Sequence, residues 1–160
     1  MIGAIAGRPV GQVGILVPDL DVALERWSAA WGGGPWRCFT YGPEFVPSFW
    51  YRGEPSRSSM RLALGTQMPQ IELIQPLGGG PSVYDGCGPG LHHLGFYVES
   101  LVEAMTSMAD AGYETTQWGA GYGLDGDGGF AYFDTVADLG VILEAIEVPK
   151  RRREPEAVFP

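Results

Sequence analysis

Two stretches decide the fold of this 160-residue chain because they repeat one pattern: residues 12–31, QVGILVPDLDVALERWSAAW, and residues 93–112, HLGFYVESLVEAMTSMADAG. Each begins with an apolar run of strand length and then changes to the spacing of an amphipathic helix. The sequence therefore predicts an internal duplication whose unit starts with a strand and a helix. When the stretches are laid over one another they match at four pairs of positions: Gly14 and Gly95, Val17 and Val98, Leu20 and Leu101, and Ala23 and Ala104.

The ends of both predicted helices carry capping signals. Asp19 is the expected N-cap of the first helix, Ser100 and Glu103 form a capping box in the second, and Gly112 ends it. Shorter strand-like runs follow each helix, separated by Gly, Pro and Asp. They cover roughly residues 36–41, 47–52, 59–65 and 70–75 in the first half, and roughly 113–118, 129–135 and 140–147 in the second.

These elements predict an α+β fold made of two βαβββ modules. The modules cover residues 8–77 and 90–149, and the segment 78–90, GGGPSVYDGCGPG, joins them. Together with a C-terminal tail at residues 150–160 they form a single domain over residues 1–160. The basic run from Lys150 to Arg153 favours a solvated extension, and contact with a partner or an anionic ligand is the alternative.

Composition excludes several classes of protein. A net charge of −9 argues against a nucleic-acid surface, which needs clustered positive charge. No apolar run approaches the roughly 20 residues that span a bilayer, and the N-terminus lacks a signal-peptide pattern. Cys38 and Cys87 do not imply a disulfide framework. A soluble, cytoplasmic protein is expected, with no membrane or nucleic-acid partner.

The alternation of strand side chains selects the polar residues that share a face. Gln12 and His93 occupy equivalent positions in the repeat, on the strand face opposite the helix. His92 is predicted to face the other way and to be structural or to lie at an edge. Glu72 and Glu144 lie in the middle of apolar last strands, where an unpaired carboxylate is expensive to bury. If the first and last strands line one concave sheet, these four polar residues converge on one site.

A convergence of Gln12, Glu72, His93 and Glu144 would suit a metal ion. One imidazole, two carboxylates and an amide oxygen favour a divalent ion such as Zn, Ni, Co, Mn or Mg, with positions left open for substrate. Asp125 and Asp127 could suggest calcium, but their loop lacks the terminal Glu of an EF-hand, so a flexible turn is favoured.

Four stretches resemble the vicinal oxygen chelate superfamily, which includes glyoxalase I, methylmalonyl-CoA epimerase, ring-cleaving dioxygenases and antibiotic-resistance proteins. They are QVGILVPDLDVALERW, QIELIQPLG, GLHHLGFYV with its following helix, and FAYFDT with GVILEAIE. The resemblance implies a U-shaped mixed sheet around a central cavity, a homodimer, and metal ligands at Gln12, Glu72, His93 and Glu144. Many relatives have His at the first position, but the eukaryotic glyoxalase I set is itself Gln, Glu, His and Glu.

The expected function is that of a metal-dependent isomerase or epimerase, or a glyoxalase-like lyase, that removes a proton next to a carbonyl. The metal would stabilise the enolate. The resemblance to glyoxalase I implies that Glu144, and also Glu72, is the base. The substrate would be a small carbonyl compound, hydrophobic or CoA-linked. A metal-free protein that sequesters a drug or shapes a cyclisation is the alternative, and a ring-cleaving dioxygenase is disfavoured because only His93 supplies imidazole.

Aromatic residues suggest the walls of a substrate pocket. The candidates are Trp50, Tyr97, Tyr122 and Tyr132. Core or dimer contacts are the competing interpretation, because aromatic residues dominate both.

Overall fold

The predicted duplication is present in the computed structural model, which describes residues 4–160. The first three residues of the predicted domain therefore lie outside the described part. Each half contains a strand, a helix and three further strands, as the sequence indicates. The first half consists of β1 (Gln12–Leu16), α1 (Leu20–Ala30), β2 (Trp36–Tyr41), β5 (Ser59–Leu64) and β6 (Gln70–Gly78); the second consists of β7 (Gly90–Tyr97), α2 (Leu101–Asp110), β8 (Thr115–Ala120), β9 (Gly129–Phe133) and β10 (Ile142–Glu147).

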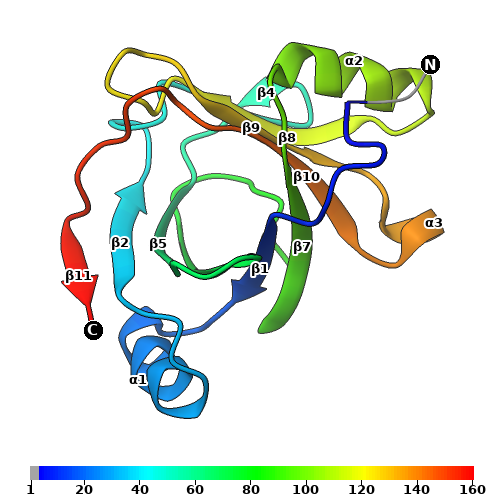
Figure 1. Cartoon of the computed structure of the whole chain (residues 1–160). Coiled ribbons are helices and arrows are strands. Elements are labelled where there is room, and N and C mark those ends of the chain that lie inside the picture. Colours follow the sequence, from blue (N-terminus) through cyan, green and yellow to red (C-terminus); the bar gives the residue numbers. More distant parts are fainter. Residues whose placement is uncertain (1–3) are drawn as a thin grey trace.

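All strands of residues 4–160 belong to one mixed sheet of 11 strands, in the order β11-β2-β5-β6-β1-β7-β10-β9-β8-β3-β4. The first strand of each half runs parallel to the last strand of the same half, and β1 and β7 are antiparallel neighbours. Figure 1 shows the strands curving around the middle of the molecule, with α1 and α2 outside. This order makes β6, β1, β7 and β10 consecutive, so the four predicted ligand strands are adjacent.

Both helices begin where the capping signals predict. The carboxylate of Asp19 accepts a hydrogen bond from the Val22 amide at 3.0 Å, and the Ser100 hydroxyl accepts one from the Glu103 amide at 3.2 Å. Each helix buries one apolar stripe against its own half of the sheet. The buried residues are Leu20, Ala23 and Leu24 in α1, and Leu101, Ala104 and Met108 in α2.

The strand predicted at residues 47–52 exists but belongs to the other half. β3 (Ser48–Tyr51) and the short β4 (Glu54–Pro55) extend the edge of the second half, where β3 pairs with β8. The two faces of β3 explain this placement. Phe49 packs edge-on against Phe130 at 6.1 Å between ring centroids, while Trp50 stacks on Trp118 at 6.0 Å. Aromatic contacts across strands therefore favour pairing of this hairpin with the second module instead of the first.

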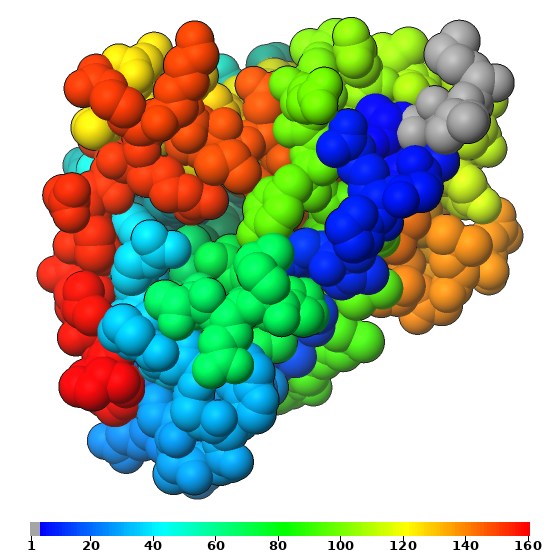
Figure 2. Space-filling view, in the orientation of Figure 1, coloured from blue at the N-terminus to red at the C-terminus, as the bar shows by residue number. Residues whose placement is uncertain are grey.

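The C-terminal tail lies at the surface, where Figure 2 shows it in red, but it is a paired segment rather than a free extension. β11 (Ala157–Phe159) pairs antiparallel with β2, and the Glu156 carboxylate accepts hydrogen bonds from the Thr40 amide and hydroxyl, both at 2.9 Å. The edge of β2 offers unpaired backbone groups, which a short extended segment can satisfy. We call residues 148–160 the C-terminal strap; it is the red segment that runs beside β2 in Figure 1.

The inner side of the sheet is filled mainly by aromatic and aliphatic side chains. The joint between the halves contributes Tyr84, which is only 5% exposed. A short helix, α3 (Val136–Leu139), precedes β10. No helix among residues 4–160 has the length and apolar character needed to cross a membrane. The inner core consists of Leu16, Phe39, Val46, Phe49, Met60, Leu62, Leu64, Ile74, Tyr84, Tyr122, Phe130 and Tyr132.

Candidate metal centre

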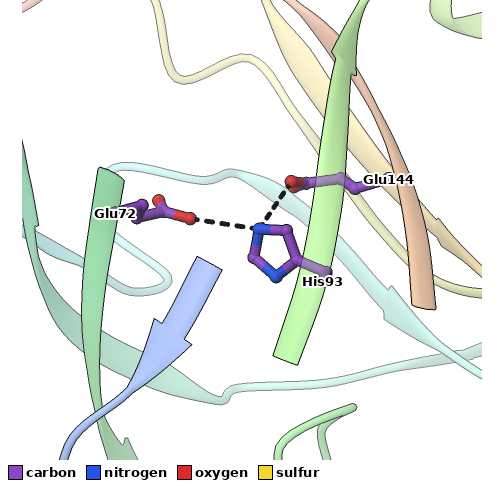
Figure 3. Close-up of side chains that lie close together, drawn as sticks. All are labelled: Glu72, His93 and Glu144. Carbon is purple, nitrogen blue, oxygen red and sulfur yellow. Dashed lines mark ion pairs between the residues drawn. The ribbon is translucent and has the colours of Figure 1, made fainter. Parts of the chain in front are cut away.

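Three of the four predicted ligands meet in the middle of the sheet. Glu72 from β6, His93 from β7 and Glu144 from β10 each offer one ligand atom, and these atoms lie within 4.8 Å of one another. The Nε2 atom of His93 is 3.0 Å from Glu144 Oε2 and 3.4 Å from Glu72 Oε2 (Figure 3). His93 is fully buried, and all three side chains come from a single chain.

The atoms that face one another at this point have no hydrogen-bond partner among the described residues. They are Glu72 Oε2, His93 Nε2 and Glu144 Oε2. A buried polar atom without a partner costs roughly 1–3 kcal/mol, and more when it is charged. A divalent cation bound between two carboxylates and one imidazole nitrogen would satisfy all three atoms. The donor set therefore fits a metal ion on its own geometry.

The pKa values of His93 and Glu144 are shifted because the two groups are buried next to each other. Burial alone lowers the pKa of His93, but Glu144 and Glu72 act against it and raise that pKa to about 10. Burial raises the pKa of Glu144, and the neighbouring imidazole opposes this effect. Without a cation, the cluster thus holds a proton between the imidazole and the carboxylates. A cation of higher charge would take the place of that proton.

The repeat-matched glycines explain how these side chains fit between closely spaced strands. Gly14 is the strand neighbour of both Glu72 and His93, and Gly95 is the neighbour of both Gln12 and Glu144. A Cβ atom on Gly14 would lie 2.0 Å from Cε1 of His93, and one on Gly95 would lie 3.3 Å from Glu144 Oε2. The match between Gly14 and Gly95 therefore reflects the space that the site requires in each half.

Gln12 is buried beside the three charged residues and is held in place by Gln70, which the sequence pattern did not single out. The Gln12 amide donates to Gln70 Oε1 at 3.0 Å, and the Tyr97 hydroxyl donates to the same oxygen at 3.3 Å. The amide of Gln70 in turn donates to the Gly65 carbonyl at 3.0 Å. With its nitrogen engaged, Gln12 has its carbonyl oxygen free to act as a ligand. The sequence signal that could have identified Gln70 is its position two residues before Glu72, which places both polar side chains on the same face of β6.

His92 lies on the same side of the sheet as His93, so the prediction that it faces away is wrong. In the pairing with β1, Gly14 is opposite His93 but Ile15 is opposite Leu91, which leaves His92 as an extra residue in a β-bulge. A bulge interrupts the alternation on which the prediction was based. The rings of His92 and His93 are 5.3 Å apart, and both lie against Tyr132.

The two histidines and the joint form a hydrogen-bond chain that fixes the tautomer of His93. Nε2 of His92 is 3.3 Å from the Val83 carbonyl, which can only accept, so this nitrogen carries the hydrogen. Burial and, to a lesser extent, the charge of the neighbouring His93 lower the pKa of His92 to about 4, which keeps the ring neutral. Its Nδ1 therefore accepts from His93 Nδ1 at 3.0 Å. Nδ1 of His93 therefore carries a hydrogen, and its Nε2, which faces the two carboxylates, is the nitrogen that would bind a cation in place of the shared proton.

Replacing His92 with alanine is expected to weaken binding of a divalent ion by roughly 10–100-fold, the usual effect of removing the partner that orients a ligating histidine. Titration of the purified protein with Zn²⁺ or Co²⁺, followed by calorimetry or Co²⁺ absorption, measures this change. His92→Gln keeps a side chain that can accept from His93 and donate to Val83, and should retain more affinity than His92→Ala. Equal affinity in the alanine variant and the unmodified chain would show that the chain of hydrogen bonds does not orient His93.

The predicted substrate-binding aromatic residues fall into different places. Tyr122 lines the pocket at the site, and Tyr132 lies edge-on to His93 with ring centroids 5.1 Å apart. Tyr97 contacts Gln70 and borders a neighbouring hollow with Arg8 and Pro69. Trp50 is on the face of β3 opposite Phe49, where it stacks on Trp118, and it does not lie with Tyr122 and Tyr132.

A small pocket opens onto the candidate metal ligands. Its volume is about 40 Å³, and it is lined by Gln12, Tyr41, Leu62, Leu64, Glu72, Tyr122, Phe130, Glu144, Ile146 and Arg152. About 10–15 Å³ of such space is enough for one water, so this pocket has room for an ion and a few waters or a small polar group. Arg152 belongs to the strap and was not among the predicted site residues.

Comparison with known proteins agrees with this architecture. Residues 11–133 match the profile of the Glyoxalase/Bleomycin resistance protein/Dioxygenase superfamily. No curated protein matches the chain. Methylmalonyl-CoA epimerase from Mycobacterium tuberculosis has a similar structure, with a TM-score of 0.65, 22% sequence identity, and coverage of 94% of this chain and 93% of that one.

Two further solved structures are similar at lower identity. A hypothetical protein from Bacillus halodurans has a TM-score of 0.58 at 18% identity, with 92% of this chain and 99% of that chain covered. A variant of Streptomyces coelicolor methylmalonyl-CoA epimerase, in complex with 2-nitronate-propionyl-CoA, has a TM-score of 0.58 at 16% identity, with 91% and 98% covered. At these identities the likeness concerns the fold. The profile match extends over most of the chain, and the chain therefore belongs to the Glyoxalase/Bleomycin resistance protein/Dioxygenase superfamily.

Proposed function

We propose that this protein is a metal-dependent enzyme that removes a proton next to a carbonyl group, as an epimerase or isomerase or as a glyoxalase-like lyase. The observation that carries the proposal is the convergence of Glu72, His93 and Glu144, with three buried atoms that have no other partner. Gln12 completes the set as the fourth ligand. The curved sheet would act as a U-shaped wall around the substrate cavity.

Each residue of the site has a role in this chemistry. A bound divalent ion would supply Lewis acidity to stabilise an enolate. Glu144 is the best placed base, because it is buried and its raised pKa suits proton transfer better than that of an exposed carboxylate. Glu72 flanks the opposite side of His93 and is the second candidate base. Gln12 and His93 hold the ion without taking the proton.

An acyl-CoA thioester is the substrate class that we propose. Three of the similar structures support this choice, because they are methylmalonyl-CoA epimerases solved with methylmalonyl-CoA or 2-nitronate-propionyl-CoA. A thioester provides both the carbonyl that a metal polarises and an acidic neighbouring C–H bond. We also propose a homodimer, which mass measurement in solution tests directly.

The proposed activity is tested by proton exchange in heavy water. The purified protein is expected to bind about one divalent ion per chain and to exchange the C2 proton of methylmalonyl-CoA for deuterium, as followed by NMR. Removal of the ion with a chelator should stop exchange, and adding Zn²⁺, Co²⁺, Ni²⁺, Mn²⁺ or Mg²⁺ back should restore it. Failure of every ion to bind would contradict the proposal. Tight binding of a hydrophobic compound without any effect of metal would instead favour the metal-free alternative.

A further inference from the structure

The C-terminal strap directs one of its three consecutive arginines into the site. Arg151 forms an ion pair with Asp125, and Nε of Arg153 donates to the Tyr122 carbonyl at 3.3 Å. The Lys150 amide also donates to Asp127 at 2.8 Å. Asp125 and Asp127, which the sequence analysis placed in a flexible turn, therefore hold the strap. Neighbouring side chains of an extended segment point in opposite directions, so Arg152 points away from these anchors.

Arg152 lines the small pocket together with Gln12, Glu72 and Glu144. It is partly buried, and no ion pair or side-chain hydrogen bond involves it among residues 4–160. The charge of Arg152 also affects neighbouring tyrosines. Burial raises the pKa of Tyr41 and of Tyr122, and the Arg152 charge opposes the rise in both. A guanidinium group with five donors therefore faces the site without a partner.

A second guanidinium group lies on the same inner face. Arg37 shares a face of β2 with Phe39, a member of the inner core, because the two are two residues apart in the strand. The register partner of Arg37 is Leu64, which is paired in turn with Glu72. The Nε atom of Arg37 is buried and has no hydrogen-bond partner among the described residues. Both Arg37 and Arg152 act on the Tyr97 hydroxyl by their charge. Arg37 and Arg152, which are far apart in the sequence, thus lie near the same part of the site.

The charges around the site become unbalanced once a metal ion is bound. A divalent cation neutralises the carboxylates of Glu72 and Glu144, and the two guanidinium charges of Arg37 and Arg152 then remain. In a chain whose formal net charge is −9, such a local excess is not a general property of the surface. Partly desolvated cations without a counterion are unfavourable, and an anion that binds between them relieves that cost. The site is therefore complementary to a negatively charged group.

We propose that Arg152, assisted by Arg37, binds a carboxylate on the acyl part of the substrate, next to the carbon that loses its proton. This proposal rests on the proposed function for the identity of the reacting group. The planar guanidinium group matches a carboxylate in two parallel hydrogen bonds, whereas the phosphates of CoA are bulky and belong at an open surface. The substrate is then a thioester of a dicarboxylic acid rather than a simple acyl thioester.

The test compares two thioesters that share CoA and differ in the carboxylate. Calorimetry with the metal-loaded protein is expected to show that Arg152→Gln weakens binding of methylmalonyl-CoA by roughly 10–100-fold, the usual range for a lost hydrogen bond to a charged group. Binding of propionyl-CoA, which lacks the carboxylate, should change less than about twofold. Arg151→Gln is the matched control, because it removes a neighbouring strap arginine whose side chain faces Asp125.

Each other outcome overturns the inference in a recognisable way. If Arg152→Gln weakened binding of both thioesters equally, the guanidinium group would contact CoA instead. If Arg151→Gln and Arg152→Gln lowered the affinity equally, Arg152 would serve only to hold the strap. An unmodified chain that binds neither methylmalonyl-CoA nor malonate has no such carboxylate site. Metal binding and deuterium exchange are measured separately. If metal binding and deuterium exchange persist but Arg152→Gln does not weaken methylmalonyl-CoA binding selectively, the inference fails and the proposed function stands. If Arg152→Gln weakens methylmalonyl-CoA binding selectively but the unmodified chain shows no deuterium exchange, the proposed function fails and the carboxylate site stands.

Discussion

Replacing Glu144 with glutamine is expected to slow deuterium exchange at C2 of methylmalonyl-CoA by roughly 10²–10⁴-fold, the contribution of a well-placed general base. Glutamine has nearly the same shape as glutamate, but its amide cannot accept the proton. The side chain is 4% exposed and next to His93, so water has little access to replace it as a base. NMR detection of the exchanging proton measures the rate directly.

Two comparisons separate the loss of a base from the loss of a ligand. Glu154→Gln removes an exposed carboxylate of the strap that makes no ion pair among residues 4–160, and should leave the exchange rate within about twofold. Glu72→Gln should lower metal affinity, but added metal should recover more of its activity than it recovers in Glu144→Gln. If both glutamate variants recover equally with metal, Glu144 is only a ligand and the base lies elsewhere.

Replacing Gly14 with alanine is expected to remove the metal site almost entirely. The new methyl group would lie 2.0 Å from Cε1 and 2.4 Å from both nitrogens of the His93 ring, distances that real contacts do not reach. The ring is fully buried and held by His92, so it can move away only by leaving its ligand position. We expect metal affinity to fall more than about 100-fold and the free energy of unfolding to fall by roughly 1–3 kcal/mol.

Denaturant unfolding and metal titration of the same variant measure both effects. Gly88→Ala is the matched control, because a Cβ atom at this position would meet nothing within 4 Å and the backbone needs no left-handed conformation there. Its stability and metal affinity should match those of the unmodified chain. Normal metal affinity in Gly14→Ala would mean that the ring of His93 does not lie over Gly14 when the ion binds.

The sequence predicted the fold where local patterns and spatial neighbours agree. The repeat placed β1 and β7, and strand alternation placed His93, Glu72 and Glu144 on the inner face. These predictions needed only short-range periodicity, since regular strands preserve it. The consecutive strands β6, β1, β7 and β10 bring Glu72, His93 and Glu144 together within one chain.

The errors occur where long-range pairing overrides the local pattern. His92 was assigned to the wrong face because the bulge opposite Gly14 depends on how β1 and β7 meet, which their separate sequences do not reveal. The pairing of the strap was missed because β11 is short and its partner β2 lies far away in the chain. Arg152 was missed for the same reason.

The pairing of β3 with β8 also has a consequence for how the protein folds. A duplicated architecture suggests that each half could form alone and dock afterwards, but the first half here holds a strand whose hydrogen bonds and aromatic stacking belong to the second. During synthesis, β3 can pair with the short β4, but its other edge must remain without a partner until β8 has been made. Acquisition of structure should accordingly be a single cooperative event, and a fragment that ends before β7 would expose an unpaired, aromatic edge prone to self-association.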